Sequence, residues 1–177
     1  MDKVALRNFA VNAKEKMEKE IKRKLELIGI TENKIEEGIV SENDYLKIGS
    51  TELNKREIKQ RETLIKTLKE KMKDDDFKSA LNELIEEIAY TWFNRIIAIR
   101  FMEVNNYLDD GIRILSSGRE NDREPQIIRE VFNTDLEFSD EEKNYIYKLK
   151  EESKTEELFR FLFIKKCNKI NEILPEL

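Results

Sequence analysis

The 177-residue sequence contains no histidine, one cysteine, two prolines and five glycines, and each scarcity excludes a class of protein. Without histidine the chain lacks the side chain that proteins use most often as a general base and as a metal ligand near neutral pH. The single cysteine, Cys167, excludes an internal disulfide framework and a cysteine-based zinc site, and it suits a reducing compartment. We therefore expect no metal site in this chain.

The glycines and the apolar residues are too dispersed for a nucleotide loop or a membrane span. The five glycines are Gly29, Gly38, Gly49, Gly111 and Gly118. They form neither a G-x-G-x-x-G nor a G-x-x-x-x-G-K-[ST] motif, so no loop of the kind that cradles a phosphate is present. No apolar run reaches the roughly 20 residues that span a bilayer. The first 13 residues show no signal-peptide pattern. We expect a cytoplasmic chain that binds no membrane and holds no cofactor.

Helix-forming and charged residues are abundant. Charged side chains make up 40% of the chain and hydrophobic ones 39%, and with so few turn residues this composition favours helices over a many-stranded sheet. We predict an all-α fold, an irregular helical bundle around a central buried helix at about 77–108, with a long charged peripheral helix at 51–73. The length suits a single domain, 1–177, with sub-parts 1–73 and 74–177.

Local signals predict where these helices begin and end. Short polar side chains that can cap a helix precede four of the predicted helices. They are Asp2, Asp74–Asp76, Ser139 with Glu142 as a capping box, and Ser153 with Glu156 as a second one. Gly29 is suited to end the first helix, because glycine adopts the left-handed conformation of a helix C-terminus without strain. We expect 41–50 to connect two helices through one further helical turn, and 112–122 to be a surface loop.

The segment 89–102 (AYTWFNRIIAIRFM) is apolar on nearly every side, which is typical of a helix buried all round. Its large side chains are the predicted structural core: Trp92, Phe93, Ile96, Ile97 and Phe101. Its aromatic residues could instead stack on nucleobases, but their helical spacing favours core anchors. Arg95, Arg100 and Glu103 are predicted to form core ion pairs, since residues three or four apart share a helical face.

Two catalytic alternatives have weaker support. Glu86, Glu87 and Glu103 could pair carboxylates for acid–base work, but the neighbouring arginines favour a structural ion-pair network. The E-x-K triplets at 20–22 and 57–59 are half of one nuclease signature. Both triplets lie in helical patterns, which favours solvated helix faces over a metal-dependent site. We therefore expect no catalytic residue in this chain.

The net charge of −5 argues against a chain that coats nucleic acid by itself, but the charge is unevenly distributed. Residues 53–73 contain eight Lys or Arg and three Glu, a balance of +5, whereas 103–157 contain sixteen acidic and eight basic residues, a balance of −8. The basic helix offers candidate contacts to DNA phosphates, and these are Lys55, Arg56, Lys59, Arg61, Lys66 and Lys69. The alternative, which the mixed charges favour, is a solvated helix with no DNA contact.

Several segments of the sequence resemble one protein family. AYTWFNRIIAIRFMEVNNYL at 89–108, IRILSS at 112–117 and EPQIIRE at 124–130 are similar to the start of the PglX-type adenine-specific DNA methyltransferases of BREX phage-defence systems. MDKVALRNFAVNAKEKM at 1–17 and FLFIKKCNKINEILPEL at 161–177 resemble the same family. The charged part from Gly29 to Met72 shows no such resemblance, and Asp109 stands where the family favours proline.

The resemblance implies a parent enzyme that transfers a methyl group from S-adenosylmethionine to the N6 of adenine in double-stranded DNA, alongside other proteins of a defence system. This chain has neither a cofactor loop nor the Asn/Asp-Pro-Pro-Tyr turn that holds a flipped adenine, and Pro125 and Pro175 stand alone. The resemblance thus implies an N-terminal helical accessory domain, with the catalytic domain expected beyond residue 177. Such a domain either helps to hold DNA or partner proteins, or is a purely structural module without a DNA contact.

Overall fold

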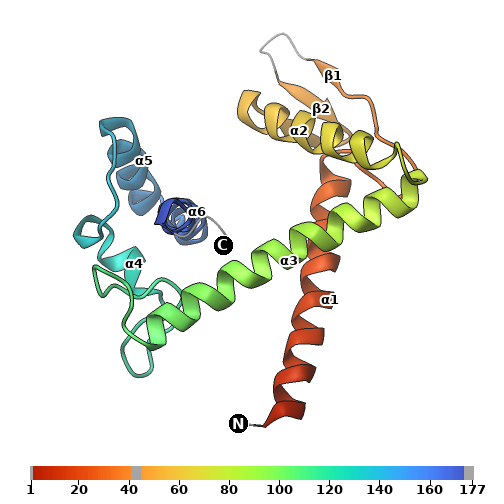
Figure 1. Cartoon of the computed structure of the whole chain (residues 1–177). Coiled ribbons are helices and arrows are strands. Elements are labelled where there is room, and N and C mark those ends of the chain that lie inside the picture. Colours follow the sequence, from red (N-terminus) through yellow and green to blue (C-terminus); the bar gives the residue numbers. More distant parts are fainter. Residues whose placement is uncertain (1, 41–44, 174–177) are drawn as a thin grey trace. The chain divides into compact units, whose positions relative to one another are not determined.

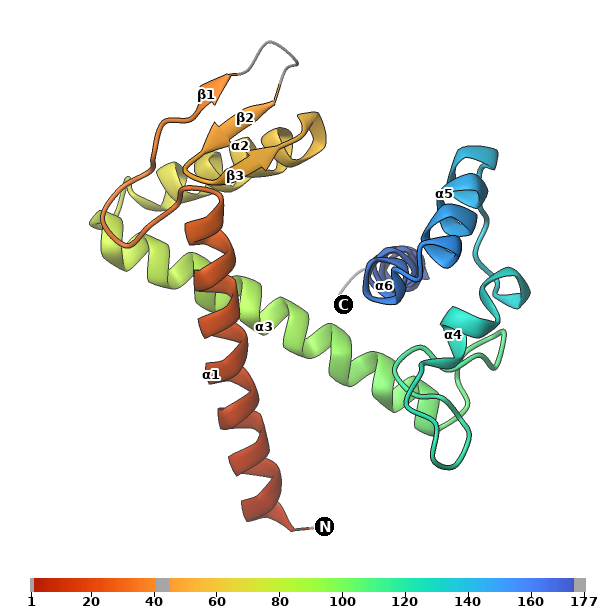
Figure 2. The ribbon, with the colours of Figure 1, turned by 180° about the vertical axis from the view of Figure 1, so that it is seen from behind.

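The computed structural model describes residues 2–40 and 45–173, and the chain divides into two compact units, Met1–Phe93 and Asn94–Leu177. Figures 1 and 2 together label the α-helices and the three strands. The N-terminal unit contains α1 (Lys3–Leu27), β1 (Ile39–Val40), β2 (Leu46–Ile48), β3 (Thr51–Leu53), α2 (Lys55–Lys71) and the first part of α3 (Phe77–Val104). The C-terminal unit contains the rest of α3, α4 (Gln126–Arg129), the 3-10 helix η1 (Val131–Asn133), α5 (Asp140–Glu151) and α6 (Thr155–Ile173). The division falls inside α3 rather than at the expected 73/74 boundary.

The strands correct the all-α prediction, which holds only for most of the chain. They form an antiparallel sheet in the order β1-β2-β3, with Ile48 opposite Thr51 across a two-residue turn. Gly49, the first residue of that turn, has φ +58°, a conformation common in tight hairpins. The helical turn predicted within 41–50 is wrong for 46–48, which is a strand, and residues 41–44 lie outside the described part.

The N-terminal unit has a small core where α1, α2 and the start of α3 meet. Leu25 of α1, Leu68 of α2 and Leu84 of α3 belong to one cluster of buried apolar side chains. Figures 1 and 2 show α2 running along one face of the sheet. This packing explains why α3 contributes to the N-terminal unit as far as Phe93. The charged helix α2 is therefore held in place by its apolar stripe, and its other side faces outward.

The predicted helix ends are largely confirmed, but the predicted cap at Ser153 is wrong, because Ser153 has φ +53° and α6 begins only at Thr155. The Asp2 carboxylate accepts hydrogen bonds from the backbone N–H groups of Val4 and Ala5, at 2.9 and 3.2 Å. Asp76 accepts from the N–H groups of Lys78 and Ser79 in the same way, and Ser139 with Glu142 forms the expected capping box. Helix α1 ends at Leu27, and Gly29 follows with φ +74°. The charged helix starts later than predicted, because Asn54 caps it and Thr51–Leu53 is a strand.

The segment 112–117, predicted as surface loop, is instead part of the core of the C-terminal unit. It forms no regular element, yet Ile112 and Ile114 are buried. A buried loop must find partners for its backbone polar groups. Side chains from other segments supply them: the N–H of Ile112 donates to Asp110 Oδ1 at 3.1 Å, that of Arg113 to Gln126 Oε1 at 3.1 Å, and that of Leu115 to Glu103 Oε1.

Helix α3 is buried on one side only in its second half, which corrects the prediction of all-round burial. Ile99 and Glu103 are each 2% exposed, whereas Ile97 is 43% and Phe101 59% exposed. The prediction that Ile97 and Phe101 are core residues is therefore wrong for this chain. Trp92, Phe93 and Ile96 are partly buried. The physical reason is that the loop and helices of the C-terminal unit cover a single stripe of α3. Within the described residues, no helix is long and apolar enough to cross a membrane.

Candidate functional site

The lysines of α2 lie on one face of the helix. At about 100° per residue, Lys55, Lys59, Lys66 and Lys69 fall within a sector of about 80° and extend over about 21 Å of helix axis. All four side chains are exposed. Leu68, which is fully buried, lies on the opposite side. We call these four residues the α2 lysine face; they are the part of the predicted DNA-binding set that the structure brings together.

The lysine face borders an open, shallow hollow. Its lining comes almost entirely from α2: Glu62, Ile65, Lys66, Lys69, Glu70 and Lys73. Two glutamates are interspersed with the lysines, so the face has mixed charge with a positive excess. A hollow formed on one helix cannot enclose a small molecule, whereas an extended row of ammonium groups can contact successive phosphates of a polyanion.

Arg61 was predicted to contact DNA, but the structure removes it from the set of exposed candidate residues. Its residue exposure is only 8%, and its guanidinium points inward. The Nε–H donates to the carbonyl of Ile28 at 2.6 Å and Nη2 donates to the carbonyl of Glu36 at 2.5 Å. Burial lowers the pKa of Arg61 from its ordinary value, with Glu62 opposing that shift. Arg61 therefore fixes the chain after α1 to α2 and has no free donor face for phosphate. Arg56 is exposed but lies about 100° around the helix from Lys55.

Replacing Arg61 with alanine is expected to destabilise the N-terminal unit by about 1–2 kcal/mol, because two charge-assisted hydrogen bonds to backbone carbonyls are lost. Urea denaturation followed by Trp92 fluorescence would measure the change. Lys59→Ala, at an exposed position two residues earlier, is the matched control and should leave the midpoint nearly unchanged. Equal midpoints for the two variants would contradict the structural role of Arg61.

The carboxylates considered for acid–base work do not form one cluster. Glu86 and Glu87 belong to the N-terminal unit, where Lys14 lies 3.8 Å from Glu86 and Lys71 lies 2.9 Å from Glu87. The hydrogen bond to Glu83, at 2.6 Å, and then the one to Glu87 raise the pKa of Lys71. The Lys14 pair joins α1 to α3, and the Lys71 pairs join α2 to α3. Both E-x-K triplets lie within helices, α1 and α2, and not on strands.

Glu103 belongs to the C-terminal unit, where it forms the predicted type of pair with Arg100. The Arg100 Nη1 atom lies 2.9 Å from Glu103 Oε2, and it also donates to Ser116 Oγ at 3.2 Å. The Glu103 side chain is fully buried, while that of Arg100 is 49% exposed. The carboxylate also accepts the Leu115 N–H. Its geometry is that of a loop anchor, because its acceptors are taken up by the fold.

Arg95 and Cys167 meet at a small cavity in the C-terminal unit. Ala98, Ile99 and Ile170 complete its lining. Burial raises the pKa of the Cys167 thiol to about 11, and the charge of Arg95 opposes this only in part. A thiol with such a pKa stays protonated at neutral pH and is a poor nucleophile.

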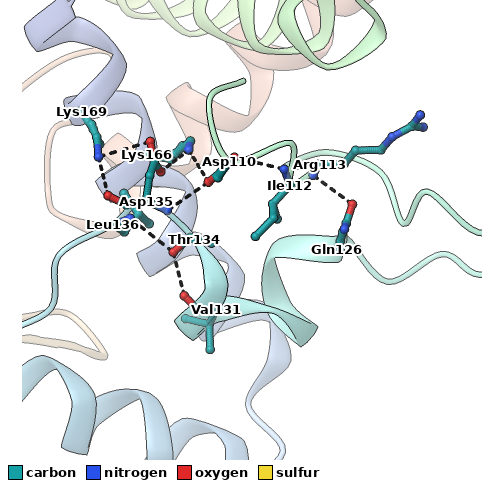
Figure 3. A network of polar contacts seen from close by, with 10 residues as sticks. All are labelled: Asp110, Ile112, Arg113, Gln126, Val131, Thr134, Asp135, Leu136, Lys166 and Lys169. Atoms are coloured by element: carbon teal, nitrogen blue, oxygen red, sulfur yellow. Dashed lines mark hydrogen bonds and ion pairs between the residues drawn. The ribbon is translucent and has the colours of Figure 1, made fainter. Parts of the chain in front are cut away.

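Sequence reasoning missed a network of buried charges in the C-terminal unit (Figure 3). Lys166 of α6 is 2.7 Å from Asp110 Oδ2 and also pairs with Asp135. Lys169 lies 3.2 Å from Asp135 Oδ2, and the Asp135 N–H donates to Asp110 Oδ2 at 3.2 Å. Burial raises the pKa of Asp135, but the hydrogen bond from Lys166 and further polar contacts outweigh it, so the net pKa is lowered. The sequence feature that could have indicated this network is the lysine pair Lys165–Lys166 inside a strongly apolar helix, because a buried lysine needs an acidic partner.

The strand-to-helix connection at Asn54 does not fit S-adenosylmethionine. The connection from strand to helix at Asn54 has no glycine loop. Its helix N-terminus is already occupied, because Asn54 Oδ1 accepts the N–H groups of Arg56 and Glu57 at 2.9 and 3.1 Å. The part of the chain that the structure describes also contains no group of three or more Cys, Asp or Glu side chains that could hold a metal ion. The described residues thus offer an exposed row of lysines on α2 and structural ion pairs.

Comparison with known proteins relates the chain to two adenine-specific methyltransferases. No protein-family model matches the chain. It is 40% identical over its whole length to the adenine-specific methyltransferase PglX of Lacticaseibacillus casei, strain Zhang. It is 27% identical, over 96% of its length, to the adenine-specific methyltransferase BrxX of Escherichia coli O9:H4, strain HS.

The matches cover nearly all of this chain but only a small share of each relative. The match to PglX covers the whole chain, so it includes the charged part from Gly29 to Met72 that showed no resemblance by inspection. The chain spans only 15% of the length of PglX and 14% of that of BrxX. The resemblance inferred from the sequence is thereby confirmed: the chain is related, along its whole length, to a segment of the PglX-type adenine-specific methyltransferases.

Proposed function

We propose that the chain is the N-terminal helical accessory region of an adenine-specific DNA methyltransferase of phage defence, and that its α2 lysine face helps to hold DNA. The relation to PglX and BrxX supports the first part. The observation that carries the second part is the alignment of Lys55, Lys59, Lys66 and Lys69 on one exposed face. The methyl donor, S-adenosylmethionine, and the adenine N6 acceptor would be bound by residues outside this chain.

The chemistry of the lysine face suits backbone contacts and not base reading. Lysine is a flexible point charge that binds phosphate without fixed geometry, whereas base edges in the major groove call for bidentate partners. Of the two arginines in the predicted DNA-binding set, Arg61 donates to backbone carbonyls and Arg56 lies off the lysine face. The proposed contribution is therefore electrostatic and independent of DNA sequence. It would hold the duplex while the catalytic part extracts and methylates an adenine.

A salt titration of the full-length methyltransferase tests this proposal. Changing Lys55, Lys59, Lys66 and Lys69 to glutamine is expected to weaken DNA binding at least tenfold near 0.1 M salt. It is also expected to reduce the slope of log affinity against log salt by about 3–4, since each neutralised phosphate contributes about 0.9. Fluorescence anisotropy with a labelled duplex would measure both quantities.

The control variant changes four exposed lysines of α1 by the same total charge, Lys3, Lys16, Lys19 and Lys24 to glutamine. It should leave the salt slope close to that of the unmodified protein. If the two quadruple variants behave alike, the lysine face makes no specific contribution. The chain would then be a purely structural module of the methyltransferase, the alternative that the interspersed Glu62 and Glu70 favour.

A further inference from the structure

The outward face of α3 changes character along the helix. Near its start this face carries glutamates: at about 100° per residue, Glu83 and Glu86 fall in the same sector as Ile97, Phe101 and Val104 further along. The Glu83 and Glu86 side chains are 56% and 63% exposed, as expected of a solvated helix face. Ile97, Phe101 and Val104 replace that polar surface with apolar side chains of comparable exposure. Exposed apolar side chains grouped on one helix face are typical of a surface that binds another protein segment.

The apolar side chains form one patch within the C-terminal unit. Phe101 and Val104 are 59% and 61% exposed. Tyr107, also 59% exposed, packs its ring edge to face against Phe101 with centroids 5.8 Å apart. The opposite side of α3 is already covered, because Ile99 and Glu103 are buried. We call Ile97, Phe101, Val104 and Tyr107 the α3 apolar patch.

We infer that the α3 apolar patch is the surface on which the remaining, larger part of the same methyltransferase polypeptide docks. This inference rests on the proposed function, because it requires the chain to be a segment of a longer PglX-type protein. The lengths of the relatives indicate what could cover the patch, because this chain spans only 15% of PglX and 14% of BrxX. Most of such a polypeptide therefore lies outside the matched segment.

The area of the patch favours an occupant on the same polypeptide over a second copy. With about 100 Å² exposed on each of four partly exposed side chains, the patch offers about 400 Å². A stable complex between separate proteins buries about 800 Å² on each partner. A segment joined covalently to its partner needs less, because the linkage gives a high effective concentration. The patch is also aromatic-rich and carries no charge, which suits a permanent interface.

Cysteine labelling tests the inference directly. Phe101→Cys is made in the 177-residue chain and in the full-length protein, and the rate of reaction with a thiol reagent is measured in both. We expect the thiol to react at least tenfold more slowly in the full-length protein. Ile39→Cys, at a position 77% exposed in the N-terminal unit, is the matched control and should react at similar rates in both. The native Cys167 is buried and contributes little background.

Each outcome has a defined meaning. Equal labelling rates of Phe101→Cys in the two proteins would overturn the inference. Protection already present in the 177-residue chain, rising with its concentration and accompanied by a dimer in sedimentation, would also overturn it in favour of a second copy. The salt titration tests the lysine face separately. If Phe101→Cys is protected in the full-length protein but the lysine variant leaves the salt slope unchanged, the proposed DNA contact is rejected and the docking surface is retained.

Discussion

Replacing Lys166 with methionine is expected to lower the free energy of unfolding of the C-terminal unit by about 3–5 kcal/mol. Methionine fills most of the volume of lysine, so packing is largely preserved, but Asp110 and Asp135 lose the cation that they share, while Asp135 keeps its pair with Lys169. The Asp110 and Lys166 side chains are only 5% and 3% exposed, and water cannot easily replace the lost ammonium group. Breaking one partner of a buried ion pair in this way leaves uncompensated buried charge.

Hydrogen exchange is the appropriate measurement for Lys166→Met, because the only tryptophan, Trp92, belongs to the N-terminal unit. Protection of amides in α6 reports the stability of the C-terminal unit. Lys143→Met is the control: its side chain is 46% exposed, and its partner Asp140 is 93% exposed. That exposed pair should contribute almost nothing. Loss of α6 protection to the same extent in both variants would contradict the role assigned to the network.

A triple variant separates charge from packing. Combining Lys166→Met with Asp110→Asn and Asp135→Asn removes all three charges, so much of the lost protection should return. The single oxygen of the asparagine introduced at position 110 can still accept the Ile112 N–H that Asp110 Oδ1 accepts, but its amide nitrogen cannot accept the Asp135 N–H that Oδ2 accepts, so part of the loss should remain. If the triple variant is as unstable as Lys166→Met, the loss comes from altered packing and not from unpaired carboxylates.

The same network predicts a dependence on acidity. The pKa of Asp135 is lowered in the folded chain. A carboxyl whose pKa falls on folding stabilises the fold at pH values above its unfolded pKa of about 3.9, and that contribution is lost as the pH falls through the folded value. The difference in stability between the unmodified chain and Lys166→Met should therefore narrow below about pH 4. A difference that stays constant down to pH 2 would exclude Asp135 as the group responsible.

The features that sequence predicted correctly are those decided within a few residues. An N-cap such as Asp2 or Asp76 needs only the amides two and three positions ahead, and the conformation at Gly29 is intrinsic to glycine. Contacts between residues that lie far apart in the sequence show no comparable local pattern. In the sequence Arg61 is one more basic residue of the same helix as Lys59, yet its guanidinium donates to the carbonyls of Ile28 and Glu36. The strands escaped prediction because two or three residues are too few to show alternation.

The second half of α3 shows a different limit of sequence patterns. Apolar residues on all sides predict that every side avoids water, and they do not identify what covers each side. Within this chain, the buried loop and neighbouring helices cover only the side of Ile99 and Glu103. The side of Phe101 and Val104 remains exposed. The loop at 112–117 was misplaced for a related reason: its polar partners, Glu103 and Gln126, lie on flanking helices.

Glu103→Ala is expected to destabilise the C-terminal unit by about 2–4 kcal/mol, because the buried N–H of Leu115 loses its acceptor and a cavity forms. The carboxylate is the link between α3 and the buried loop, since it accepts from Leu115 and pairs with Arg100. Hydrogen exchange of the backbone amides in the segment 112–117, measured at increasing urea concentration, would report the loss of stability. We expect these amides to lose protection before those of the N-terminal unit.

Two control variants decide which contact of Glu103 matters. Arg100→Ala removes the ion pair alone, and because that side chain is 49% exposed, its loss should have only a small effect. Glu103→Gln keeps an oxygen acceptor for the Leu115 N–H and should recover most of the stability that Glu103→Ala loses. If Arg100→Ala is as damaging as Glu103→Ala, the ion pair stabilises this unit more than the backbone hydrogen bond. If Glu103→Gln recovers nothing, the negative charge itself is required to hold the loop.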